Sequence, residues 1–84
     1  MMLAMGSPRS RVTLTALGPG GVVAEHAADG PITVQPLTGS VRFTAEGRDY
    51  DLVPGQLLAL RAGIRHSVTS GDGGSFLLTV VLGS

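Results

Sequence analysis

The chain contains no cysteine, no lysine and no tryptophan in its 84 residues. Without cysteine it can form no disulfide, no thiolate nucleophile and no cysteine-based zinc site. Its apolar runs are far shorter than the roughly 18 to 20 residues that a membrane helix requires. The beginning of the chain lacks both the early positive charge and the long apolar core of a signal peptide. We therefore expect a cytoplasmic protein with no membrane partner.

Charge is also scarce and balanced, with 6 arginines against 6 acidic residues and a formal net charge of zero. The arginines are scattered singly, whereas a nucleic-acid-binding domain presents a clustered basic face, so we expect no nucleic-acid partner. A chain of this length forms one domain with a thin core, which buries only about 60 to 65% of its unfolded surface. Contact with a second copy is the remaining source of buried surface, and we therefore expect a homodimer.

Short apolar runs separated by glycine and proline turns fill most of the chain. Runs of about five residues that end in such turns are typical of a small antiparallel barrel or sandwich, and no stretch has a helical period of useful length. The expected strands cover residues 11–17, 22–26, 32–37, 41–45, 48–52, 57–60, 66–70 and 75–82. We predict an all-β jelly-roll barrel of about eight short antiparallel strands with little or no helix. It occupies residues 11–84, and residues 1–10 form a flexible arm.

Three local signals refine this prediction. Glu46-Gly47 has the length and composition of a tight hairpin turn. Pro36 cannot donate a ladder hydrogen bond, so its strand lies at an edge or carries a bulge there. The run 57–60 does not alternate, which predicts a strand covered on both sides.

Two other runs do alternate. Val12 and Leu14 share one face of their strand while Thr13 and Thr15 share the other, and Val41 and Phe43 likewise lie on one face. Alternation of this kind is typical of a strand with one buried and one solvated face.

Glycine and histidine recur at fixed spacings in the second half of the chain, as Gly55, Gly63 and His66. This spacing resembles the second motif of the cupins, which reads G, five residues, P-x-G, two residues, H, three residues, N. Arg61 replaces the proline of that motif and Ser70 its asparagine. The resemblance implies an RmlC-like cupin barrel, a double-stranded β-helix of the jelly-roll class.

The first cupin motif reads G, five residues, H-x-H, three or four residues, E, six residues, G, and it is only half present. Gly39 matches its closing glycine and His26 its first histidine, while Gly21 lies one residue from the place of the opening glycine. Ala28 stands in place of the second histidine and Ile32 in place of the glutamate. The resemblance therefore implies the barrel together with a degenerate metal site.

His26 and His66 are the only histidines of the chain, and the cupin pattern points both into the barrel. Cupin sites use three histidines and a glutamate to hold zinc, iron, manganese, nickel or copper, whereas two imidazoles alone rarely hold such an ion tightly. The possible third ligands are Glu25, Asp29 and Gln35. Glu25 and Gln35 are expected on the opposite strand faces, whereas Asp29 lies in a loop from which it could fold inward. We expect no bound cofactor, with a divalent metal at His26 and His66 as the alternative.

We expect the two histidines to be pocket or core residues, hydrogen-bonded to each other, to water or to backbone. The mouth of a small barrel is a common ligand site. The predicted pocket consists of His26, Ile32, Val34, Phe43 and His66, and no residue is assigned a catalytic role.

Other charged residues are expected to be solvated. Asp49 and Asp51 alternate around Tyr50 on the outer face of a strand. Arg61 and Arg65 flank a glycine turn at the barrel mouth, where an anionic ligand is the alternative to simple solvation.

Three functions remain open at this point. The first is a non-catalytic or metal-poor cupin that binds a small apolar or weakly anionic molecule in its barrel, and some cupins of this size resemble the sensing domains of transcription regulators. The second is a metal-dependent oxygenase or isomerase that uses His26 and His66. The third is a structural or interaction module whose barrel is filled by its own side chains. The first is our prediction, although a fold of this kind hosts many unrelated chemistries.

Overall fold

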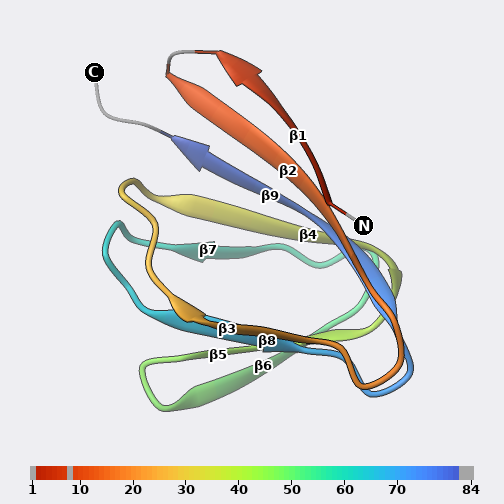
Figure 1. Cartoon of the computed structure of the whole chain (residues 1–84). Helices are drawn as coiled ribbons and strands as arrows, with labels where there is room; N and C mark the ends of the chain where they lie inside the picture. Colours follow the sequence, from red (N-terminus) through yellow and green to blue (C-terminus); the bar gives the residue numbers. More distant parts are fainter. Residues whose placement is uncertain (1, 8, 82–84) are drawn as a thin grey trace.

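The computed structural model describes residues 2–7 and 9–81, and it is built from strands alone (Figure 1). The strands are β1 (Met2–Ser7), β2 (Ser10–Leu17), β3 (Val22–His26), β4 (Ile32–Gly39), β5 (Val41–Ala45), β6 (Arg48–Leu52), β7 (Leu58–Leu60), β8 (His66–Thr69) and β9 (Gly74–Val81). All the pairings are antiparallel. The described residues form no helix, and hence none that could cross a membrane. The predicted all-β fold is confirmed.

The strands form two sheets that face each other as layers (Figure 1). The five-stranded sheet has the order β1-β2-β9-β4-β7, and the four-stranded sheet has the order β3-β8-β5-β6. The apolar side chains that face inward from both sheets form one core, which consists of Ile32, Val34, Val41, Phe43, Leu52, Val68, Phe76 and Val80. Alternation along each strand supplies these residues, because successive side chains point to opposite faces.

The hairpin and the irregular strand are as the sequence predicts. Residues 46 and 47 connect β5 to β6 with backbone φ angles of 52° and 74°, which is the pair of positive values that a type I′ hairpin turn needs. In β4 the register against β9 shifts between Pro36 and Thr38, so the bulge expected at the proline is present. Val41 and Phe43 face the core, each at most 2% exposed.

The two ends of the five-stranded sheet differ from the sequence-based expectation. Residues Met2–Ser7, expected within a flexible arm, form strand β1, which pairs with β2 in a continuous register. The run 57–60, expected to be a strand covered on both sides, forms the shorter strand β7 at the edge of the sheet. Ala59 of β7 is exposed, and Leu57 just before it is 58% exposed. Absence of alternation in so short a run did not distinguish a buried central strand from an edge strand.

Strand β2 turns its threonines inward. Thr13 and Thr15 lie opposite Leu78 and Phe76 of β9 in the sheet register, and residues opposite each other share a face. Phe76 is a core residue, so the threonine face of β2 is the inner one. Val12 and Leu14 therefore lie on the outer face of the sheet.

The glycine that the cupin motif places at residue 39 has a steric reason in this fold. Gly39 has a φ of 65°, and a Cβ built on it would collide with the carbonyl oxygen of Gly73 and lie 2.9 Å from the Cα of Gly74. Gly63 has a similar φ of 79°, but a Cβ there would meet nothing within 4 Å. Both positions therefore need a residue that tolerates a positive φ, but only Gly39 also lies too close to another backbone segment to accept a side chain.

This pair gives a test of the fold. We expect Gly63→Ala to lower the free energy of unfolding by about 1 to 2 kcal/mol, the cost of a left-handed conformation. We expect Gly39→Ala to lower it by about 3 kcal/mol or more, because two backbone segments must also separate. Urea denaturation followed by circular dichroism measures both. Equal losses in the two variants would contradict the close backbone approach.

Candidate functional site

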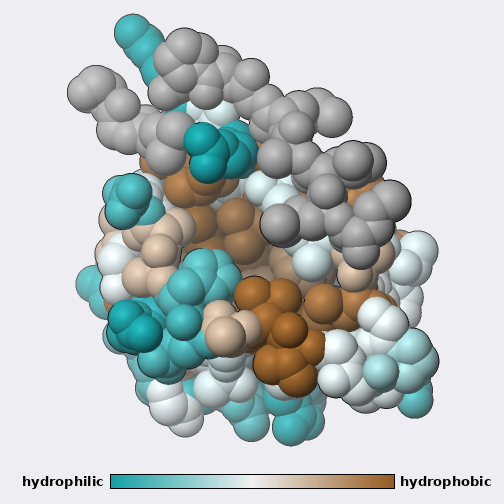
Figure 2. Space-filling view, in the orientation of Figure 1, coloured by the Kyte–Doolittle hydropathy of each residue, from teal (hydrophilic) through white to brown (hydrophobic). Residues whose placement is uncertain are grey.

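A small cavity lies between the two sheets on the side where β2 faces β3. Its volume is about 180 Å³. It is lined by Thr13, Thr15, Val23, His26, Val68, Phe76 and Leu78. Figure 2 shows apolar side chains between polar ones on one face of the molecule. The lining is thus mostly apolar, with two hydroxyl groups and one imidazole, which is the usual composition of a small-molecule site.

The two histidines contact each other, and His26 lines this cavity. Residues 26 and 66 are paired across β3 and β8, and their ring centroids are 4.4 Å apart with an angle of 61° between the planes. His66 is 1% exposed, whereas His26 is exposed at the end of its strand. The predicted meeting of the two imidazoles is therefore present in the structure, with one ring inside the barrel and the other at its mouth.

Backbone carbonyls fix the tautomer of both rings. Nδ1 of His26 lies 3.0 Å from the carbonyl oxygen of Ala24, and Nδ1 of His66 lies 3.1 Å from that of Ile64. Because a carbonyl oxygen only accepts, we assign the proton of each neutral ring to Nδ1, which leaves Nε2 as an acceptor. Nε2 of His66 is buried and has no hydrogen-bond partner.

The buried imidazole continues into the core as one member of a row of rings. His66 stacks on Phe43 with centroids 6.0 Å apart, and Phe43 meets Phe76 edge to face at 5.2 Å. Phe76 also lines the cavity. The row connects the exposed ring of His26 to the centre of the core, so the orientation of His66 is set by packing as well as by its hydrogen bond.

Burial lowers the pKa of His66 below its usual 6.5, and the nearby His26 lowers it further, while the hydrogen bond to Ile64 acts in the opposite direction. Loss of hydration disfavours the charged imidazolium in this environment. The neutral ring, with its free Nε2 acceptor, is therefore the form present at neutral pH.

The structure places the predicted pocket residues in two different environments. His26 lines the cavity, and His66 contacts the ring of His26 without being a lining residue itself. Ile32, Val34 and Phe43 are packed in the core with at most 2% exposure and are not among the lining residues. The residues that replace them in the lining come largely from β2 and β9. The alternation of β2 singles out Thr13 and Thr15 as one face, but nothing local to that strand shows that this face is the inner one.

The candidates for a third metal ligand are not brought to the two imidazoles. The Glu25 carboxylate pairs with the guanidinium of Arg65, with Oε1 2.8 Å from Nε. Across residues 2–7 and 9–81, no three histidine, cysteine or acidic side chains are grouped so that they could hold a metal ion. Asp29 therefore does not complete a three-ligand site with the two imidazoles. The described residues therefore offer two nitrogen donors at this site, one fewer than the protein ligand set of a typical catalytic metal centre.

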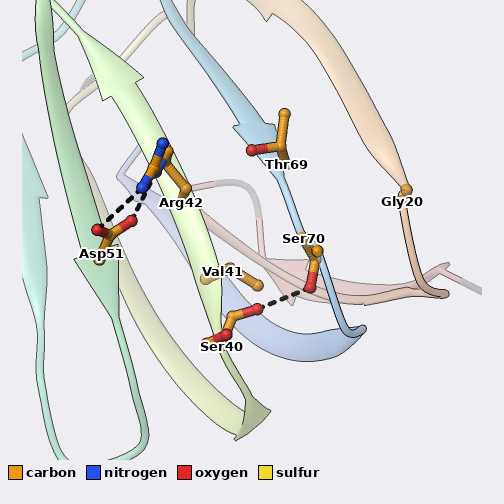
Figure 3. Close-up of a pocket in the computed structure, with 9 residues that line it drawn as sticks. Gly20, Ser40, Val41, Arg42, Asp51, Thr69 and Ser70 are labelled. Carbon is orange, nitrogen blue, oxygen red and sulfur yellow. Dashed lines mark hydrogen bonds and ion pairs between the residues drawn. The ribbon is translucent and has the colours of Figure 1, made fainter.

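A second, larger hollow lies on the outer face of the four-stranded sheet (Figure 3), with a volume of about 560 Å³. Its charged residues are already paired, since Nε of Arg42 lies 2.7 Å from Asp51 and Nη1 lies 3.8 Å from Asp49. The hydroxyl of Ser70 donates to the carbonyl of Ser40 at 2.7 Å. Both aspartates thus lie on a solvated face as predicted, and the polar groups of this hollow are largely satisfied within the chain.

The remaining predicted site residue, Arg61, forms a long ion pair with Glu46 at 3.9 Å, and both side chains are exposed. Exposed pairs of this kind contribute little to stability.

The family of the chain follows from a sequence match over this same barrel. A model of the AraC-like ligand binding domain matches residues 13–83. The chain belongs to this family. No curated protein matches the sequence. The AraC-like match covers every strand from β3 to β9 and most of β2, so it includes all the residues that line the cavity.

Solved structures confirm the resemblance to cupins. The fold is similar to a cupin superfamily protein from Desulfitobacterium hafniense, with a TM-score of 0.90 and 23% identity over 99% of this chain and 79% of that one. It is also similar to a conserved protein of unknown function from Streptococcus pyogenes, with a TM-score of 0.89 and 25% identity over 100% and 76% of the two chains. A cupin domain from Bordetella pertussis gives a TM-score of 0.82 and 19% identity over 99% and 93%.

The lowered pKa of His66 predicts a pH dependence of stability. The unfolded chain binds the proton near pH 6.5 and the folded chain only at lower pH, so the unfolded state binds more protons between the two values. The neutral ring's contribution to the free energy of unfolding is therefore complete above the pKa that His66 has in the unfolded chain. It declines as the pH falls toward the lower pKa that His66 has in the folded chain. We expect the free energy of unfolding to decrease between about pH 7.5 and about pH 5.5.

Urea denaturation at a series of pH values measures this dependence. We expect His66→Phe to flatten the curve in this range, because the phenyl ring can stack on Phe43 but does not titrate. The matched variant His26→Phe should keep most of the slope. An unchanged slope in His66→Phe would show that the buried imidazole is not its source.

Proposed function

We propose that this AraC-like ligand-binding domain is a non-catalytic small-molecule-binding barrel. Its ligand occupies the cavity between β2 and β3 and donates a hydrogen bond to the imidazole pair. The observation that carries the proposal is the buried, unpartnered Nε2 of His66, whose ring contacts that of His26, a residue that lines the apolar cavity. The ligand class is a small, mainly apolar molecule with one hydroxyl or amine group.

The energetic argument rests on the cost of an unpaired buried acceptor. Leaving such a group without a hydrogen bond costs about 1 to 3 kcal/mol. A ligand donor that reaches Nε2 would remove this cost, while its apolar part would occupy space lined by Val23, Val68 and Leu78. The cavity of about 180 Å³ equals about six water volumes at about 30 Å³ each, so it suits a molecule smaller than a drug.

The two polar classes of ligand are not equally supported. Among the lining residues none carries a permanent positive charge, and the lowered pKa of His66 keeps that ring neutral at neutral pH. A weakly anionic ligand would need a protonated imidazole, whereas a neutral donor pairs with the ring as it stands. The geometry therefore favours the apolar donor-bearing class over the anionic class.

A metal-dependent activity is the second candidate, and the tautomers favour it. An imidazole that donates its Nδ1 hydrogen to a backbone carbonyl and presents Nε2 is the usual form of a histidine metal ligand. Both histidines have this form. The described residues supply no third histidine, cysteine or acidic ligand at the site, and we therefore place this candidate second.

Titration of the isotope-labelled protein with benzyl alcohol and with toluene, followed by amide NMR, tests the first candidate. The two probes are similar in shape, and only the alcohol donates a hydrogen bond. We expect saturable shifts at Thr15, Val68 and Leu78 with both probes, and about 5- to 10-fold tighter binding of the alcohol. His66→Phe should remove the difference between the probes.

Two outcomes would contradict the proposal. Absence of saturable shifts at the lining residues with either probe would show that the cavity takes no ligand of this size, which is the expectation for a barrel filled by its own side chains. Near-stoichiometric metal in protein purified without a histidine tag, lost in both His26→Ala and His66→Ala, would establish the metal-dependent candidate instead.

A further inference from the structure

A groove on the outer face of the five-stranded sheet has a single charged residue in its lining. Its volume is about 390 Å³, and it extends over the neighbouring strands β7, β4 and β9 (Figure 1). The charged residue is Arg61, which the sequence places beside a glycine turn. The other lining residues are apolar except for two threonines, Thr33 and Thr79. The groove therefore combines an apolar surface with one cationic group, and it shares no residue with the lining of the cavity between the sheets.

Short side chains on three strands form the floor of this groove. Thr33 of β4 lies opposite Ala59 of β7 and opposite Thr79 of β9, and residues opposite each other share a face. Ile32 and Val34, on either side of Thr33, are core residues, so the row of three faces outward. Two threonines and an alanine leave the sheet surface low at this point, because none of these side chains reaches far above the backbone.

One end of the floor is bordered by two chain segments that are bonded to each other. Pro31 comes two residues before Thr33, and Val81 comes two residues after Thr79, so both continue the outer face at that end. The amide of Val81 donates to the carbonyl of Pro31 at 3.0 Å. Arg61 directly follows β7 and lines the groove at the same end. A ligand that lies over the floor therefore reaches the guanidinium there.

The guanidinium of Arg61 is only loosely engaged by the protein itself. Among the described residues its one ion pair is with Glu46, where Nη2 lies 3.9 Å from Oε2. This distance is longer than a hydrogen bond, and the two side chains are 83% and 60% exposed. Arg65, by contrast, has its Nε 2.8 Å from the carboxylate of Glu25. Exposed pairs contribute little to stability, so an external carboxylate can take the place of Glu46 at small cost.

We propose that this groove binds a small amphipathic carboxylate, an aliphatic monocarboxylic acid in its ionised form. Its carboxylate pairs with Arg61, whose planar fork of donors matches two carboxylate oxygens. Its aliphatic chain lies over Thr33, Ala59 and Thr79 and removes the apolar surface of the groove from water. Charge complementarity selects this occupant, because a neutral hydrocarbon leaves the cation unused and a compact polar anion leaves the apolar surface exposed.

The dimensions of the groove fit an aliphatic chain of medium length. From β7 to β9 the floor spans two strand spacings, or about 10 Å. The groove volume of about 390 Å³ equals about 13 water volumes of about 30 Å³ each. An open groove covers a methylene group on one side only, so we expect each additional methylene to tighten binding about two- to fourfold.

Titration with butanoate, hexanoate, octanoate and hexanol, followed by amide NMR of the isotope-labelled protein, tests this proposal. We expect saturable shifts at Thr33, Ala59 and Thr79, with an affinity that rises along the carboxylate series. Hexanol should bind the groove about fivefold more weakly than hexanoate, because it cannot form the ion pair. Arg61→Gln removes the charge from an exposed side chain and should lower the affinity for octanoate about fivefold. The matched Arg65→Gln, which changes the arginine on the other side of the same turn, should keep the wild-type affinity.

Three results would overturn the proposal. The first is the absence of saturable shifts at the floor residues with every carboxylate, and the second is an equal affinity for octanoate in the wild type and Arg61→Gln. The third is a set of shifts at the floor that depends on protein concentration but not on octanoate, which would show that a second copy of the chain covers the groove. His66→Phe changes the surroundings of the cavity and not the groove, so octanoate should bind this variant as tightly as the wild type. Failure of the benzyl alcohol titration at the cavity therefore leaves the groove result unaffected.

Discussion

The face-to-face packing of the two sheets is the constraint on which the rest of the structure depends. It is centred on Phe43 and Phe76, one from each sheet, whose rings meet edge to face 5.2 Å apart. Neither sheet has another apolar surface of comparable burial, so each strand must direct its inner face to this centre. The stacking of His66 on Phe43 fixes the imidazole in the same layer, and the buried acceptor is a consequence of the packing.

The same constraint explains where the cavity lies. Beside Phe76 the inward positions of β2 are occupied by short side chains, those of Thr13 and Thr15. The backbones stay at the separation that the two phenylalanines impose, because well-packed interiors deform little. The short side chains cannot span this separation, so space remains between β2 and β3, and the site is open where His26 ends its strand.

The inward threonines have a second consequence on the other side of the sheet. Strand alternation is strict, so a strand that directs threonines to a cavity must direct its valine and leucine outward. The polar lining of the cavity and the apolar outer face of β2 thus follow from one choice of register in this strand. The charged side chains of the four-stranded sheet, by contrast, pair with one another on a solvated face and take part in neither.

The sequence by itself determined the fold, because local signals decide it. Turn glycines, the Glu46-Gly47 hairpin and the bulge at Pro36 follow from backbone sterics and hydrogen bonding within a few residues. It also placed the two imidazoles together, through the cupin spacing. Only the tertiary structure decided which face of β2 is inner, that β1 is paired, that the run before Arg61 is an edge, and that Ile32, Val34 and Phe43 fill the core while Thr13 and Thr15 line the cavity. Those outcomes depend on which strands become neighbours, and a period of two along one strand is the same whichever side is covered.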